Sequence, residues 1–272
     1  MCFKKSKNKE EAKKSNVVKR KRLKDGKVVS FGRLESPYDI RDYALEDFMC
    51  ELPCSTSFWA PQERLWEFPK ESLDQEDTSH CVGYSGASWG ISLPVFTPFE
   101  NEDGERFYRE CKKLEGNPDS ESGAYVRSIA KVLKNNKHLN NYAFAQNIDD
   151  IRWWLLHKGP VIVGTIWTEG MMDPDDNNII FPTGRNLGGH AYVLTEVTND
   201  GYFGLQNSWG ANWGDNGKAY ISINDFEEIF KKRGEAIAAV EVVVPPKKEW
   251  KIVEWFEKAI NTIVNFFRNL SN

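Results

Sequence analysis

Three short segments, far apart in the chain, together carry the side chains of a cysteine-nucleophile site. The thiol of Cys81 is followed much later by the imidazole of His190, in a Gly-Gly-His-Ala segment, and then by the amide of Asn207, in an Asn-Ser-Trp-Gly segment. A thiol becomes a useful nucleophile near neutral pH only as the thiolate, which needs a base or a cation beside it. A third polar group must then hold the imidazole ring. The chain therefore has to fold so that these three segments converge.

The order of these segments resembles that of the papain-like cysteine peptidases over roughly residues 37–245. Gln75 stands six residues before Cys81, which is the family spacing for the glutamine of the oxyanion hole. The run that begins at Asn207 matches the family's Asn-Ser-Trp-Gly stretch almost residue for residue, and the opening at 36–43 resembles that of bacterial and phage members. A lone Cys, His or Asn is weak evidence, whereas four elements in order are specific.

The resemblance implies a hydrolase that cleaves peptide bonds through a thioester acyl-enzyme. In that scheme Cys81 is the nucleophile, His190 pairs with the thiolate and protonates the leaving amine, and Asn207 orients the ring. The side-chain amide of Gln75 and the backbone N–H of Cys81 would hold the oxyanion.

The resemblance also implies two residues of the substrate cleft. Trp209 would shield the hydrogen bond of the catalytic imidazole from water, and Gly189 would contact the substrate. The family needs no metal and no cofactor, so none is expected.

The chain departs from the family pattern around the nucleophile. His80 and Val82 flank Cys81, where the family has a small residue before the cysteine and an aromatic residue after it. A further cysteine, which forms a structural disulfide in secreted members, is replaced around Thr78. His80 is adjacent to the thiol and therefore points elsewhere, so we expect it to line the cleft.

Hydrophobic periodicity predicts an α+β fold. Helical patterns occupy 81–93, with Ser79 as candidate N-cap, and then 123–134 and 149–157, and short β-branched or aromatic runs follow. The resemblance gives this order a two-lobe form: a helical left lobe with Cys81, an antiparallel β-rich right lobe with His190 and Asn207, and the site in the cleft between them. The expected strands are 161–167, 191–197, 202–206, 218–223 and 236–244.

Both ends of the chain differ in composition from the predicted peptidase domain at 37–245. Residues 1–30 contain twelve Lys or Arg against three acidic residues, although the net charge of the whole chain is −4. We expect residues 1–36 to form a flexible basic arm for an acidic partner, too short and too charged for an inhibitory proregion of the family. An apolar stripe at helical spacing predicts that 246–272 is an amphipathic helix for docking or assembly. Docking to another protein or self-association is favoured, and packing on the body is the alternative.

The five cysteines are odd in number and show no disulfide framework, which indicates a reducing compartment. There is no secretory signal pattern at the N-terminus and no apolar run long enough to span a membrane. These features predict a cytoplasmic or virion-associated protein.

Two other classes of function are compatible with the sequence. One is a catalytically idle papain fold that serves as a binding or structural module, for example in a virion. The other is an amidase that acts on a cell-wall peptide. Labelling with a thiol-reactive inhibitor and product analysis separate these from a peptidase.

Overall fold

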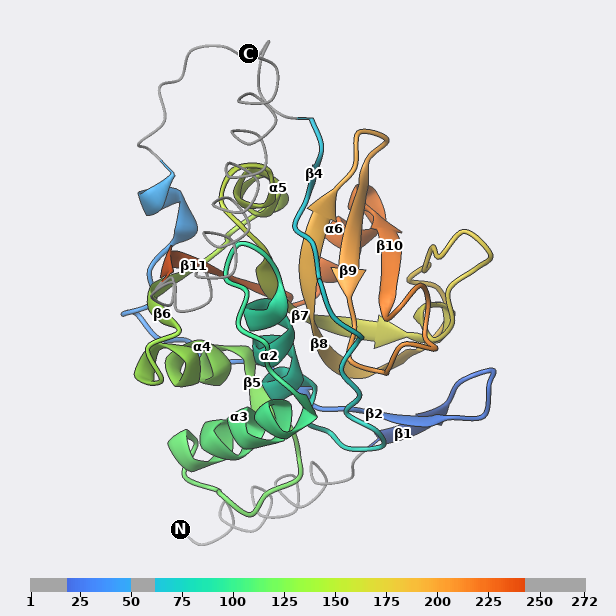
Figure 1. The fold of residues 1–272 in the computed structure, drawn as a ribbon, viewed down its shortest axis with the longest axis horizontal. Coiled ribbons are helices and arrows are strands. Elements are labelled where there is room, and N and C mark those ends of the chain that lie inside the picture. The colour runs from blue at the N-terminus through green and yellow to red at the C-terminus, as the bar shows by residue number, and fades with distance from the viewer. Residues whose placement is uncertain (1–18, 50–61, 243–272) are drawn as a thin grey trace, which may run out of the picture.

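The computed structural model describes residues 19–49 and 62–242, which form two lobes side by side (Figure 1). One lobe is built from helices and the other from a large antiparallel sheet. The helices are α2 (Cys81–Ile91), α3 (Asn101–Leu114), α4 (Val126–Asn135), α5 (Ile148–His157) and α6 (Ile223–Phe230), with short 3-10 turns at Leu45–Phe48 and Glu169–Met171. The strands are β1 (Lys19–Arg22), β2 (Val28–Phe31), β3 (Arg33–Leu34), β4 (Arg64–Leu65), β5 (Ala124–Tyr125), β6 (Leu139–Phe144), β7 (Val161–Thr168), β8 (Asn186–Val197), β9 (Tyr202–Gln206), β10 (Lys218–Ser222) and β11 (Glu235–Val242).

The helical lobe is organised around α2, whose residues are all buried. A helix of this kind, rich in Gly, Ala and Ser, can be surrounded closely on every side, and α3 and α4 pack against it. The first turn of α3 is fixed by a reciprocal capping box between Glu100 and Asp103. The lobe thereby has its own hydrophobic core, which includes Trp89, Phe107 and Ile129.

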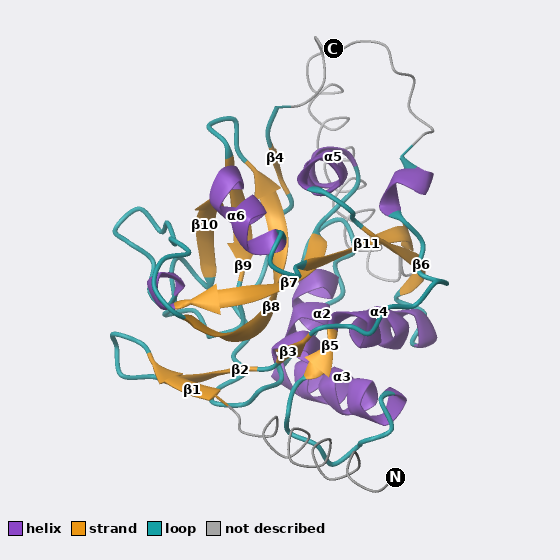
Figure 2. Cartoon of the chain, turned by 180° about the vertical axis from the view of Figure 1, so that it is seen from behind, coloured by secondary structure: helices purple, strands orange, loops and turns teal. Residues whose placement is uncertain are grey.

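The second lobe is a seven-stranded sheet in the order β10-β9-β8-β7-β11-β6, with β4 added along β8. Each neighbouring pair in it is antiparallel. Helices α5 and α6 pack on the sheet, and a second core includes Trp154, Trp167 and Phe203. The long strands β7 and β8 run beside α2 (Figure 2), so the two lobes share one boundary.

The predicted fold class is confirmed, because helices come first along the body and antiparallel strands follow. The helices and strands expected from periodicity are present within a few residues of their expected ends. Helix α3, strand β6 and helix α6 were not expected.

The flexible arm predicted for residues 1–36 is wrong from Lys19 onward. Strands β1 and β2 form a hairpin, and the chain continues through Gly32 into β3, which lies parallel to β5 (Figure 2). Leu23, Val29 and Phe31 are buried, and they belong to the core of the sheet lobe. Burial of these apolar side chains offsets the cost of ordering a Lys-rich segment. Residues 1–18 lie outside the described residues, as do 243–272, which contain the whole predicted C-terminal helix.

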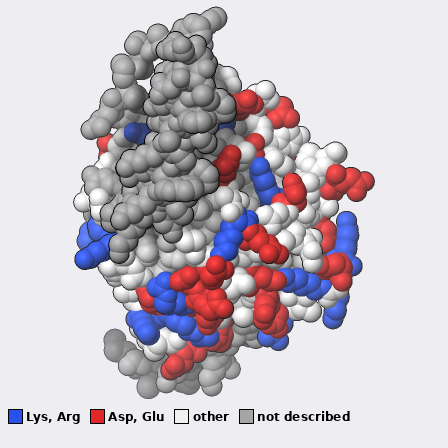
Figure 3. Space-filling model, in the orientation of Figure 1, with Lys and Arg blue, Asp and Glu red and all other residues white. Residues whose placement is uncertain are grey.

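The surface of the described residues carries both signs of charge. Acidic and basic side chains are intermingled on the face shown in Figure 3, and many are paired, as in the contacts of Arg106 with Asp103 and of Arg109 with Glu105. Within 19–49 and 62–242, no helix is long and apolar enough to cross a membrane.

Candidate active site

Cys81 is the first residue of α2, and its side chain is fully buried beside the sheet lobe. Its sulfur accepts hydrogen bonds from the backbone N–H groups of Ala191 on β8, Gly32 and Val82. The first N–H groups of a helix have no acceptor within it and carry its positive partial charge, which favours a thiolate at this position. The predicted nucleophile therefore lies against the strand that carries the predicted imidazole.

His190 and Asn207 form the hydrogen bond that the sequence predicts. Nε2 of His190 lies 2.8 Å from Oδ1 of Asn207, and the same oxygen accepts the N–H of Ser208 at 2.8 Å. Because this oxygen is the acceptor of both bonds, Nε2 is the protonated nitrogen of the neutral ring. Nδ1 is buried without a hydrogen-bond partner among the described residues. Its lone pair is thus available next to Ala191, whose N–H contacts the sulfur of Cys81.

Aromatic rings enclose this imidazole. The ring of Trp209 lies 4.8 Å from that of His190, and the ring of Trp167 on β7 lies 4.9 Å from it. Both tryptophans are fully buried, so water is kept away from the bond between His190 and Asn207. The substrate-site role of Trp209 stays a prediction, and Trp167 was missed because only the pairing of β7 with β8 brings it near.

Gln75 is held in place by two hydrogen bonds to Ser208, the residue that follows Asn207. Its N–H donates to the Ser208 carbonyl at 2.9 Å, and its Oε1 accepts the Ser208 hydroxyl at 2.8 Å. With Oε1 held, its Nε2 donates to the carbonyl of Thr78 at 2.7 Å and reaches the carbonyl of Ser30 at 3.4 Å. Gln75 thus has one N–H that faces a carbonyl of the N-terminal segment.

The N-terminal segment runs between the two lobes at this point, and residues 28–34 are called the closing segment below. A Cβ atom on Gly32 would lie 1.7 Å from the carbonyl oxygen of Ser79, and one on Gly123 would lie 2.1 Å from the oxygen of Gly32. On the opposite wall, a Cβ on Gly189 would lie 2.2 Å from the Arg33 oxygen. Gly189 therefore lies directly against the closing segment, and its contact with substrate stays a prediction.

The closing segment is bonded to both lobes. The carbonyl of Gly32 accepts the N–H of Ala124 in the helical lobe at 2.8 Å. Arg33 forms an ion pair with Glu235 on β11 at 2.5 Å, and both side chains are largely buried. Phe31 places its ring 6.1 Å from that of His190. Sequence reasoning missed this segment, although Val28–Phe31 is a short β-type run within the basic stretch.

Closure removes the charge from the site. Burial raises the pKa of the Cys81 thiol to about 11, and the backbone N–H groups offset only part of this effect. Burial also lowers the pKa of His190 to about 4, against the opposing effect of its bond with Asn207. Because an ion pair is costly to bury, the pair is a neutral thiol and a neutral imidazole in this closed state.

His80 does not line the cleft, which corrects the expectation. Its ring is buried in the helical lobe between the carboxylates of Glu105 and Glu121 and stacks on Tyr108 with a centroid distance of 3.7 Å. It is the N-cap residue of α2, but its side chain makes no capping bond. Ser79 does not cap the helix either, because its hydroxyl donates to the carbonyl of Glu121.

The described residues contain no group of three or more His, Cys, Asp or Glu side chains placed to hold a metal ion. Cys81 and Cys111 are free thiols.

Comparisons with known proteins agree with this geometry. A scan against models of protein families finds no match. The fold is similar to that of xylellain, a cysteine protease from Xylella fastidiosa, with a TM-score of 0.62, 19% identity and coverage of 84% of this chain and 99% of that one. It is also similar to procathepsin B S9 from Trypanosoma congolense, with a TM-score of 0.55, 12% identity and coverage of 79% and 86%.

Sequence similarity adds to the likeness of fold. The chain is 27% identical over 127 residues to cathepsin B-like cysteine proteinase 3 of Ostertagia ostertagi, which covers 45% of this chain and 72% of that protein. Fold and sequence together indicate the class that the chain resembles: it has the fold of papain-like cysteine proteases, and its sequence is similar to that of a cathepsin B-like cysteine proteinase. The structural likeness to a bacterial protease is compatible with the bacterial character of the motifs, whereas a phage origin stays a prediction.

Proposed function

We propose that this protein hydrolyses peptide bonds with Cys81 as nucleophile and His190 as the proton-transfer group. The observation that carries the proposal is the bond from Nε2 of His190 to Asn207, which leaves Nδ1 without a partner at the residue next to Ala191, whose backbone N–H contacts the sulfur of Cys81. This is the tautomer that can accept the thiol proton.

The reaction follows from these positions. Nδ1 takes the thiol proton, and the sulfur forms a bond to the carbonyl carbon of the substrate. The imidazolium returns the proton to the amine as the C–N bond breaks, which leaves a thioester on Cys81. His190 then takes a proton from water, whose oxygen bonds to the acyl carbon as the C–S bond breaks and the acid is released. The imidazolium returns that proton to the thiolate, which restores the starting thiol and neutral ring. Asn207 holds the ring during both proton transfers.

Two donors support an oxyanion site in this proposal. The N–H of Cys81 is at the start of α2 and has no acceptor within the helix. The second is the Nε2 group of Gln75 that now faces the carbonyl of Ser30. A substrate carbonyl would take that donor, and each donor of this kind contributes roughly 10²–10³ to the rate.

Substrate can enter only when the closing segment leaves the cleft, because Cys81 and His190 are both fully buried beneath it. The described conformation is therefore the closed form of the enzyme. Solvent that enters on opening would remove the burial that keeps the thiol and the imidazole neutral, and the pair could then ionise.

Labelling with an epoxysuccinyl peptide, followed by mass mapping of the modified residue, tests this proposal. We expect the adduct on Cys81 and none on Cys111, the matched free thiol of the helical lobe. Cys81→Ala should abolish hydrolysis of casein and of small peptides, while Cys111→Ala retains it. Full activity in Cys81→Ala would refute the assignment.

The same experiment distinguishes the other two classes of function. An adduct on Cys81 with cleavage of cell-wall peptide and no cleavage of protein would indicate an amidase. Failure to label Cys81, even when the closing segment is displaced, would indicate an idle papain fold. A protein or peptide substrate, a partner for the C-terminal segment, an acidic partner for residues 1–18 and a cytoplasmic or virion location stay predictions.

A further inference from the structure

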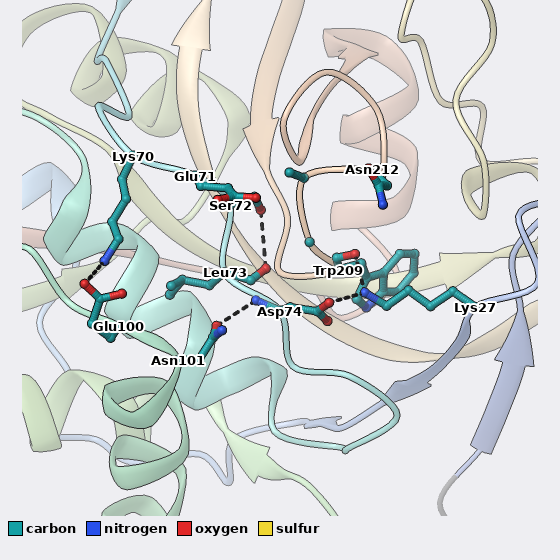
Figure 4. A pocket seen from close by; sticks show the side chains of 12 residues that line it. Lys27, Lys70, Glu71, Ser72, Leu73, Asp74, Glu100, Asn101, Trp209 and Asn212 are labelled. Carbon is teal, nitrogen blue, oxygen red and sulfur yellow. Dashed lines mark hydrogen bonds and ion pairs between the residues drawn. The ribbon is translucent and has the colours of Figure 1, made fainter.

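A cavity of about 350 Å³ lies beside Asp74, the residue before Gln75, and Trp209 (Figure 4). Its walls come from the loop before α2, the start of α3 and the turn after Trp209. Trp209 contributes to this wall and also packs on His190. Trp209 therefore separates the cavity from His190 by the thickness of one ring.

The cavity holds a side chain that comes from the N-terminal hairpin. The ammonium group of Lys27, which precedes β2, donates to the carboxylate of Asp74 and to the carbonyl of Trp209 at 2.7 Å. Lys27 is the residue next to the closing segment, so the segment that blocks the cleft also places a cation in this cavity (Figure 4).

The carboxylate of Asp74 is oriented independently of that cation. Its Oδ1 accepts the N–H of Glu76 at 2.8 Å, and its backbone N–H donates to Asn101 at 2.8 Å. The second oxygen is thereby directed at Lys27, and it would keep this direction if the hairpin moved away.

The charge of the cavity wall is acidic once Lys27 is set aside. The other lining residues carry three carboxylates, on Glu71, Asp74 and Glu100, and one ammonium group, on Lys70. Lys70 is already engaged, because it pairs with Glu100 and donates to the carbonyl of Phe99 at 2.6 Å. Departure of the hairpin would leave two acceptors without a cation: the carboxylate of Asp74, whose side chain is 33% exposed, and the carbonyl oxygen of the buried Trp209.

We propose that this acidic cavity binds a Lys or Arg side chain of the substrate, with Asp74 as the residue that determines this specificity and with Lys27 as its internal occupant in the closed form. The proposal rests on the proposed peptidase function. A substrate that extends from Cys81 past Gln75 would place one side chain in this cavity. Its ammonium or guanidinium group would then replace Lys27 on the same two acceptors.

Pairs of internally quenched peptides that differ only by Lys or norleucine at one position test the proposal. The position is moved through three residues on each side of the cleaved bond, and the ratio of kcat/KM is measured in the full chain. The fraction of open enzyme is the same for both peptides of a pair. The ratio of their kcat/KM values therefore depends on binding of the Lys side chain and not on how often the cleft opens. At one position we expect Lys to be preferred by roughly tenfold to a hundredfold, as for a charge-assisted hydrogen bond.

Three variants separate the contributions. Asp74→Asn keeps the oxygen that accepts the Glu76 N–H and should reduce the ratio at least fivefold. Arg20 lies on the same hairpin and pairs with Asp77 outside this cavity. Asp77→Asn removes that ion pair and should leave the ratio unchanged. Lys27→Met should raise the rates for both peptides without changing their ratio.

A ratio near one at every position in the wild type, or an unchanged ratio in Asp74→Asn, overturns the cavity proposal while the peptidase function stands. If no peptide is cleaved, even when Gly32→Ala displaces the closing segment, both proposals fail. Should Asp74→Asn not fold, the wild-type ratio is measured from low to high salt. A preference that depends on Asp74 at the surface falls with ionic strength, and a salt-independent ratio contradicts the proposal.

Discussion

A single methyl group at Gly32 should open the cleft. The Cβ atom of Gly32→Ala would lie 1.7 Å from the carbonyl oxygen of Ser79, which belongs to the backbone just before α2. Since an ordinary contact of this kind is about 3.4 Å or longer, the closing segment has to move by about 1.5 Å or more, and rigid packing makes small displacements costly. We therefore expect the alanine variant to populate the open form.

The expected increase in the reactivity of Cys81 follows from the pKa of its thiol. The pKa of Cys81 is about 11 in the closed form instead of its ordinary 9.0. Restoring the ordinary value increases the thiolate fraction near pH 7 by about a hundredfold, because each pKa unit is a factor of ten. Exposure of the sulfur adds to this, so the rate of alkylation by iodoacetamide should rise by about a hundredfold or more.

The assay is time-resolved mass spectrometry of the Cys81 adduct in full-length protein. Gly159→Ala is the matched control, because its Cβ atom would meet only Pro94, at 3.7 Å. Circular dichroism establishes that each variant is folded. A folded Gly32→Ala protein that reacts within about threefold of the wild-type rate would refute the closed-state interpretation.

Three further predictions concern the site and its support. Asn207→Ala and Gln75→Ala should each lower kcat by roughly 10²–10³, less than loss of Cys81, and initial rates on a fluorogenic peptide measure this. Unfolding in urea should show Lys112→Ala to be less stable than wild type by about 3–5 kcal/mol, because Lys112 is fully buried and pairs with Glu115, whereas Lys113→Ala should cost under about 0.5 kcal/mol. Acid should weaken the closed form: the pKa of His190 is lowered from 6.5 to about 4, so this neutral imidazole contributes its full stability above pH 6.5 and loses it as the pH falls toward 4. Alkylation of Cys81 at a fixed assay pH, after incubation at pH 4.5 or pH 7, measures this opening, and equal rates after both incubations would contradict it.

The sequence predicts the right lobe well because β-branched and aromatic runs of this length form strands whatever their partners are. Strands β7 to β11 lie where the pattern places them. Helix α3 was missed, although the capping box of Glu100 and Asp103 marks its start, because its charged residues obscure the apolar face of Phe107 and Cys111. A helix that is apolar on one face only has a largely charged composition, so composition alone does not predict it.

In the site, the parts that belong to local motifs are predictable from the sequence, and the parts that depend on tertiary contacts are not. The positions of Cys81, His190 and Asn207 follow from motifs, since the chemistry restricts residue type and order. The hairpin at 19–34 could not be found in this way, because its cations are paired with distant carboxylates. Arg20 contacts Asp77 and Arg33 contacts Glu235, and net charge along the sequence does not reveal such pairs.

The closing segment also has a mechanical role that is separate from access to the thiol. Phe31 belongs to the core of the sheet lobe, whereas Gly32 and β3 are bonded to the helical lobe at Ala124. The segment is therefore a tie between two lobes, in addition to the boundary that they share along α2, β7 and β8. An enzyme that releases this tie to become active also loosens the joint on which its active site is built. We expect the latent molecule to be the durable form and the working molecule to be the short-lived one.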